Sequence, residues 1–400
     1  MKTLTYCLSL FLQGICLAEI DRGVDKLNYL YKFVGKERTC KQKNMINLFR
    51  LEELQSKKLK YALYAIFILF VVAGTVLIKY YRNIFSSNID LGEKTELFIH
   101  IPSGADMETV IHIFEESKSV VNLASLKWVM EKKHYGESVK AGRYRIENRI
   151  SNNDLVNLLR SGHQAPVNLT FNNTRTLEEF AGKIGKQIEA DSLSILNFLK
   201  DEANIKPYGF KPETVIGLFI PNSYQVYWNM TAKSFTERMY QEYVKFWNVD
   251  RMKKASDLNL NPIQISTLAS IVDEETTKND EKARVAGVYL NRLKRGIKLD
   301  ADPTLKFAWG DFSMRRVLNK HKAIKSPYNT YKYAGLPPGP IRQASIAGIE
   351  AVLNFEKHKY IYFCASPEFN GYHVFARSLR EHNKNAEKYQ RALNKERIFR

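Results

Sequence analysis

The residues best placed to do chemistry are three consecutive acids, Asp273, Glu274 and Glu275, which end an apolar stretch over residues 265–276. A proline ahead of the stretch and apolar residues at helical spacing predict a helix. On a helical wheel Glu275 lies about 20° from Leu268, inside the apolar arc, whereas the other two acids face solvent.

A carboxyl held against apolar surface near a helix C-terminus has a raised pKa, because it loses hydration and meets the negative end of the helix dipole. Glu275 is therefore a candidate general acid. The alternative is a surface run of acids at a helix end, in which Glu275 reaches past the edge of the core.

Three polar or proline-rich segments follow the acids. Residues 302–304 place an acid in a rigid turn, and residues 326–331 combine hydroxyl groups with an amide. Residues 335–341 are rich in glycine and proline, which predicts a stiff, extended turn. Stiff loops with exposed hydrogen-bonding groups are typical of ligand sites, although any one of them alone is equally consistent with a connecting loop.

The elements that must position these residues indicate an α+β fold. A β-α-α-β-α block of strands and helices is predicted at residues 96–101, 106–116, 122–133, 139–146 and 151–162. The elements predicted after this block are a strand at 167–171, helices from 176, 234 and 279, strands at 360–365 and 372–375, and a basic helix from 379. Aromatic and polar residues alternate at 219–228, which suits a wall against sugar rings but is more often core packing.

Residues 61–78 carry no charge and are just long enough to span a bilayer, with tyrosines at or near both ends. Lysines precede the run, and the segment before it is basic. The positive-inside rule therefore places the N-terminus in the cytoplasm and everything after Lys79 outside. A buried core helix is the alternative.

Residues 1–18 are similar to a signal peptide, because a mostly apolar run follows Lys2. Cleavage there would leave the basic residues 22–60 outside, against the charge rule. Translation from Met45, or a first hydrophobic hairpin element, would resolve the conflict, and both stay open.

The formal net charge of +19 predicts a polyanionic partner. The charge alone does not distinguish between nucleic acid, anionic lipid and an anionic cell wall. The basic residues are spread along the chain rather than clustered with aromatics, so general solubility is an equal explanation. No His or Cys spacing predicts a metal site. Cys364, which lies in an apolar run, is predicted to be a buried strand residue.

Taken together, the motifs resemble one family. Five segments resemble the YceG-like proteins, the MltG endolytic murein transglycosylases, in their order and spacing. They are Ala269-Ser-Ile-Val-Asp-Glu-Glu-Thr276, Asp302-Pro-Thr304, Tyr328-Asn-Thr-Tyr331, Gly335-Leu-Pro-Pro-Gly-Pro340 and His382-Asn383. The resemblance covers about residues 60 to 395. The chain departs from the family pattern at Asp273, where the family has Glu, and at Ile220-Pro-Asn-Ser-Tyr224, where it has Phe-Pro-Asp-Thr-Tyr.

The resemblance implies an order of domains and a set of site residues. The domains are a basic cytoplasmic segment at 1–60, a transmembrane helix at 61–78, a LysM-like module at 96–162 and a catalytic domain at 165–400. Glu275 is the implied catalytic acid, in agreement with the helical wheel. The implied substrate-binding residues are Asp302, Thr304, Tyr328, Asn329, Thr330, Tyr331, Pro338 and Asn383, with Asp273 and Tyr224 as possible supporting residues.

The implied activity is non-hydrolytic cleavage of peptidoglycan strands by an enzyme anchored in the bacterial inner membrane, with its catalytic domain outside the cytoplasm. The expected partners are glycan strands, the membrane and peptidoglycan synthases, and no nucleic acid, metal or cofactor is expected. Two rival interpretations are a hydrolytic muramidase, with Asp302 as the second acid, and a non-catalytic wall-binding scaffold.

Overall fold

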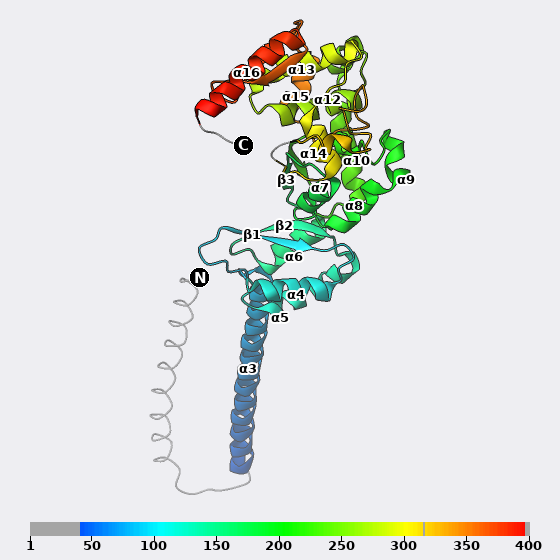
Figure 1. Ribbon diagram of the computed structural model, residues 1–400. Helices are drawn as coiled ribbons and strands as arrows, with labels where there is room; N and C mark the ends of the chain where they lie inside the picture. Colours follow the sequence, from blue (N-terminus) through cyan, green and yellow to red (C-terminus); the bar gives the residue numbers. More distant parts are fainter. Residues whose placement is uncertain (1–40, 315–316, 397–400) are drawn as a thin grey trace. The chain divides into compact units, whose positions relative to one another are not determined.

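A computed structural model describes residues 41–314 and 317–396 of the protein (Figure 1). The predictions made for residues 1–18 lie outside these described residues. The chain divides into two compact units after Arg82.

The first unit contains helix α3 (Lys41–Phe85) up to Arg82. Its part from Ser56 to Phe85 is long and apolar enough to cross a membrane. The predicted span at residues 61–78 lies inside this part, and none of the most apolar window of the helix is buried. The exposed apolar side chains, such as Leu69 and Phe70, therefore lack the protein partners that a core helix would have.

The second unit begins with the block predicted from residue 96 onward. Its elements are β1 (Glu96–Ile101), α4 (Met107–Ser117), α5 (Leu123–Lys132), η1 (Tyr135–Ser138), β2 (Gly142–Glu147) and α6 (Asn152–Ser161). Strands β1 and β2 pair antiparallel. The side chains of Asp106, Asn122 and Ser151 accept hydrogen bonds at the three helix N-termini, which is why each helix starts where local sequence predicts it. The likeness to a LysM module stays a prediction.

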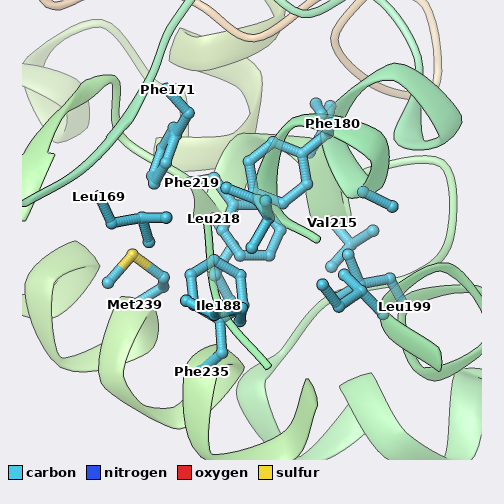
Figure 2. Packing of buried hydrophobic residues seen from close by; sticks show 14 of the residues in the cluster. Leu169, Phe171, Phe180, Ile188, Leu199, Val215, Leu218, Phe219, Phe235 and Met239 are labelled. Carbon is cyan, nitrogen blue, oxygen red and sulfur yellow. The ribbon is translucent and has the colours of Figure 1, made fainter. Parts of the chain in front are cut away.

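An aromatic core organises the next part of the second unit. Its elements are β3 (Val167–Phe171), α7 (Leu177–Ile184), α8 (Ser192–Lys200), α9 (Glu202–Ile205), η2 (Lys206–Tyr208), η3 (Val215–Leu218), β4 (Asn222–Val226) and α10 (Ala232–Phe246). Strands β3 and β4 pair antiparallel. Figure 2 shows Phe171, Phe180 and Phe219 in this core, where the rings of Phe180 and Phe219 have centroids 4.2 Å apart.

Tyr224 belongs to this same core. It is 8% exposed, its ring stacks on Phe171, and its hydroxyl donates to the carbonyl of Ile220 at 2.6 Å. The structure therefore places Tyr224 in the core and not in a wall that supports substrate. The alternation at residues 219–228 had left both possibilities open, and core packing is correct for this residue.

Helix α12 lies at the centre of the last part of the second unit. The elements here are α11 (Val249–Asp257), α12 (Pro262–Glu275), α13 (Asn279–Lys294), α14 (Asp302–Trp309), η4 (His321–Ala323), α15 (Ile346–Leu353), β5 (Tyr362–Ala365), β6 (His373–Ala376) and α16 (Leu379–Lys395). Helices α11, α13, α14 and α15 all contact α12. Strands β5 and β6 pair antiparallel, so the α+β class is confirmed. Cys364 lies in β5 as predicted, but it is half-buried.

Candidate active site

Glu275 is the last residue of α12, and its half-buried carboxyl meets the neighbouring helix α13. The hydroxyl of Tyr289 on α13 donates a hydrogen bond to Oε1 of Glu275 at 2.7 Å. The pKa of Glu275 is raised to about 7, mainly by loss of hydration and also by the negative charges of Asp302 and Glu274. The hydrogen bond from Tyr289 and the positive charge of Lys306 oppose this rise. The sequence predicted the direction of this shift and its main cause. The carboxyl is thus in a state in which it can both donate and accept a proton near neutral pH.

Asp273 is buried, which corrects the prediction that it faces solvent. Its carboxylate lies 2.7 Å from the ammonium group of Lys282 on α13. It also accepts hydrogen bonds from the backbone N–H and the hydroxyl of Ser345, at 2.7 and 2.8 Å. The prediction failed because the helical wheel assumed one buried face, whereas helices pack around α12 on several sides.

One glycine makes room for the Asp273 carboxylate. A Cβ atom at Gly348, on α15, would lie 2.6 Å from Oδ1 of Asp273. Asp273 therefore joins α12, α13 and α15 at the end of α12 that carries Glu275. Its role in this arrangement is structural, because its buried carboxylate is bonded to Lys282 and Ser345.

Glu274 is also held by the protein and does not face solvent freely. Its carboxylate forms ion pairs with Arg342 and with Arg175, the latter at 3.2 Å. Arg342 also donates to the side chain of Asn173 at 2.9 Å. The middle acid of the three therefore ties the end of α12 to the segment that precedes α7.

Asp302 lies at the start of a helix, which differs from the predicted rigid turn. It is the first residue of helix α14, because Pro303 is well suited to a first helical turn. The hydroxyl of Tyr331 donates a hydrogen bond to Oδ1 of Asp302. Asp302 is exposed, and its charge acts on Glu275. The structure thus brings Asp302 and Tyr331 together beside the candidate acid.

Thr304, Asn329 and Thr330 are buried, which argues against the direct substrate contacts predicted for them. The Asn329 amide donates to the carbonyls of Lys322 and Ile324 and accepts from the backbone of Tyr331. The hydroxyl oxygens of Thr304 and Thr330 lie 2.8 Å apart, and both are bonded to the backbone of Ala301. Because these polar atoms are already bonded within the protein, the three residues hold the loop that carries Tyr331.

The remaining predicted residues are divided between the site and the surface. The ring of Tyr328 packs on Phe307 of α14, with centroids 4.7 Å apart. Pro338 is exposed, and Asn383 is exposed on α16. Among the described residues, no hydrogen bond or ion pair joins Pro338 or Asn383 to Glu275. In the same segment as Pro338, a Cβ atom at Gly339 would lie 2.1 Å from the carbonyl oxygen of Glu213, so this position requires glycine.

Sequence reasoning missed Tyr289 and Lys282. Both lie on α13 in the spacing 282, 285, 289 and 292, which is one buried face of that helix. Polar residues inside an otherwise buried helical stripe are a signal that would have found them. In residues 41–314 and 317–396 no group of three or more His, Cys, Asp or Glu side chains is arranged to hold a metal ion.

The fold and the site define a class of protein: an α+β chain with one carboxyl suited to general acid–base chemistry near neutral pH and a second, exposed carboxyl beside it. The family model described as the YceG-like family matches residues 99–388. This match covers more than half of the chain, and the chain belongs to the YceG-like family.

Named relatives agree with this assignment. The endolytic murein transglycosylase of Bacillus subtilis is 30% identical over 325 residues, which cover 76% of this chain and 88% of the relative. The endolytic murein transglycosylase of Streptococcus pneumoniae is 28% identical over 350 residues, and the match covers 61% of that relative. A crystal structure of a YceG-like protein from Listeria monocytogenes, 26% identical, superposes with a TM-score of 0.49 and covers 73% of this chain and 99% of that one.

Proposed function

We propose that this protein is a membrane-anchored lytic transglycosylase, which cleaves the bond between N-acetylmuramic acid and N-acetylglucosamine within peptidoglycan strands and leaves 1,6-anhydro-muramyl ends. One observation carries the proposal: the Glu275 carboxyl has a pKa near 7 and is bonded to Tyr289. The names of the relatives support the substrate class.

In the first step the protonated Glu275 donates its proton to the glycosidic oxygen. The bond from C1 of the muramyl sugar to that oxygen breaks, and positive charge develops on the muramyl ring. Tyr289 keeps the carboxyl in place, and its hydrogen bond stabilises the carboxylate that this proton transfer leaves behind.

In the second step the Glu275 carboxylate accepts the proton of the muramyl 6-hydroxyl, whose oxygen attacks C1 and closes the anhydro ring. The proton count balances, because the acid gives one proton and regains one. The product forms without water, so a second carboxylate to activate water is not needed. In this mechanism the role of Asp302 is to raise the pKa of Glu275. Tyr331 presents a hydroxyl group to the sugar, and Tyr328 presents an aromatic face.

A hydrolytic muramidase is the second candidate, because Asp302 is an exposed carboxyl beside Glu275. In that enzyme Asp302 would activate a water molecule or stabilise the charged sugar. The two candidates differ in the chemical end that they leave on the strand, which makes them separable by mass.

The location of the enzyme forms part of the same proposal. Helix α3 anchors the chain in the inner membrane with the N-terminus in the cytoplasm, and the second unit meets the wall outside. An enzyme held there would cut nascent strands as synthases extend them and would set their length. The net charge of +19 suits a substrate that carries muramyl and peptide carboxylates.

The test is mass spectrometry of purified glycan strands after digestion by the full chain in detergent micelles. We expect anhydro-muramyl ends from the wild type and from Glu202→Gln, a matched change of an exposed acid on α9. Glu275→Gln should lower the rate at least about a hundredfold. Reducing ends would identify the hydrolase and implicate Asp302, and intact strands with all three proteins would favour a wall-binding scaffold.

A further inference from the structure

A cavity of about 380 Å³ adjoins the candidate active site. Its walls include the aromatic rings of Phe307 and Tyr328 and the apolar side chains of Leu177 and Ile216. Arg175 and Glu213 also line it, and these six residues define what we call the Arg175 pocket. Its volume falls within the range of ligand pockets.

The Arg175 pocket is connected to Glu275 through two of its walls. Arg175 forms an ion pair with Glu274, the residue that precedes Glu275 on α12. Phe307 lies on α14, the helix that carries Asp302 and Lys306, whose charges act on Glu275. These two links place the pocket next to the candidate active site, where we expect a substituent of a bound strand to enter it.

The pocket carries charges of opposite sign that the protein leaves available. Arg175 uses Nη2 for its ion pair with Glu274, and its Nη1 forms no hydrogen bond with any described residue. The carboxylate of Glu213 is exposed and has no hydrogen bond or ion pair in the part of the chain that the structure describes. By contrast, Lys200 and Glu178 at the rim neutralise each other at 2.6 Å.

The charge of Glu213 acts inside the pocket. Burial raises the pKa of Tyr328 to about 12, and the negative charge of Glu213 contributes to this shift. The pocket thus combines an apolar, aromatic lining with one available cation and one available anion. Such a combination complements a ligand that has a carbon skeleton, a carboxylate and an ammonium group.

We propose that the Arg175 pocket binds the peptide substituent of the muramyl residue, with a peptide carboxylate on Arg175 and the ammonium group of a diamino acid on Glu213. This inference rests on the proposed function. An N-acetylglucosamine ring carries no charge, and the lactyl group of a bare muramyl residue carries a carboxylate but no cation. Of the parts of a peptidoglycan strand, the peptide is the part that has both.

The test is calorimetric binding to the full chain in detergent micelles, carrying Glu275→Gln so that the ligand is not cleaved. Three probes are compared: a disaccharide without peptide, the disaccharide tripeptide with a diamino acid, and that tripeptide acetylated on its side-chain amine. We expect the free amine to strengthen binding about fivefold over the acetylated probe, the scale of a partly exposed ion pair. Glu213→Gln should abolish this difference, whereas the matched Glu202→Gln should keep it.

Two results would overturn the inference. Equal affinity for the peptide-free disaccharide and the tripeptide probe would show that the pocket does not receive the peptide. An acetylation effect that persists in Glu213→Gln would place the ammonium group elsewhere. Because binding is measured in a chain whose expected cleavage rate is strongly lowered, a failure of the proposed cleavage chemistry would appear in the product assay and leave this test intact.

Discussion

Glu275 is subject to opposing influences, each from an identified neighbour. Burial and the charges of Asp302 and Glu274 raise its pKa, and the Tyr289 hydrogen bond and Lys306 lower it. The outcome is a pKa of about 7, above the usual value for glutamate. A general acid must be protonated when its substrate arrives, so we expect activity to fall as pH rises through this pKa.

The fall of activity at high pH is the alkaline limb of the pH profile. Two substitutions should move this alkaline limb in opposite directions. Asp302→Asn removes a negative charge, so the pKa of Glu275 falls and the limb moves to lower pH. Tyr289→Phe removes a hydrogen bond to the carboxylate, so the pKa rises and the limb moves to higher pH. The measurement is kcat/KM on glycan strands across pH. A shift of both variants in the same direction would contradict this account of Glu275.

At the scale of elements, the end of α12 is held by a buried network of side chains that connects it to other helices. Asp273 joins α12 to Lys282 of α13 and to Ser345 at the start of α15, and the side chains of the ion pair are only 4% and 8% exposed. Glu275 lies two residues further along α12 and Tyr289 lies on α13, so this network joins the two helices that carry them.

Lys282→Met should destabilise the protein by about 3–5 kcal/mol, because it leaves the buried Asp273 carboxylate without its cation. The matched control is Lys254→Met, which breaks the exposed pair with Asp250 and should cost at most about 1 kcal/mol. Denaturant unfolding of the full chain in micelles gives both values. Equal losses in the two variants would mean that the buried pair does not hold the helices together.

At the scale of the whole molecule, the proposed function depends on the orientation of α3, which is long and apolar enough to cross a membrane. The helix passes from a lysine-rich segment through an uncharged run to Asn83, where the second unit begins. A basic flank is retained on the cytoplasmic side of a membrane. The proposed substrate lies on the other side, so the orientation of α3 is a condition for the proposed function.

Single cysteines on either side of α3 test this orientation. In a chain whose four native cysteines are replaced by serine, Lys58→Cys and Glu93→Cys each introduce one exposed thiol. A membrane-impermeant maleimide applied to intact spheroplasts should label Glu93→Cys and should label Lys58→Cys only after lysis. The reverse pattern would place the second unit in the cytoplasm and remove it from the wall.

Local sequence was sufficient wherever the determining contact is close along the chain. The caps at Asp106, Asn122 and Ser151 each bond a backbone N–H three residues further on, so the helix starts follow from neighbouring residue types. Helical periodicity over residues 265–276 indicates which way the Glu275 side chain points. Composition alone identifies the uncharged run of α3.

The tertiary structure decided the rest, because the partners lie far apart along the chain. Asp273 is buried owing to Ser345, 72 residues away, a contact that a single helical wheel does not contain. Asn329 and Thr330 form hydrogen bonds within the protein, so the same polar residues that predicted substrate contacts turned out to hold a loop. The sequence indicated that Glu275 loses hydration, which is the main cause of its raised pKa. The further effects of Tyr289 and Asp302 on that pKa depend on packing, because both residues are distant along the chain.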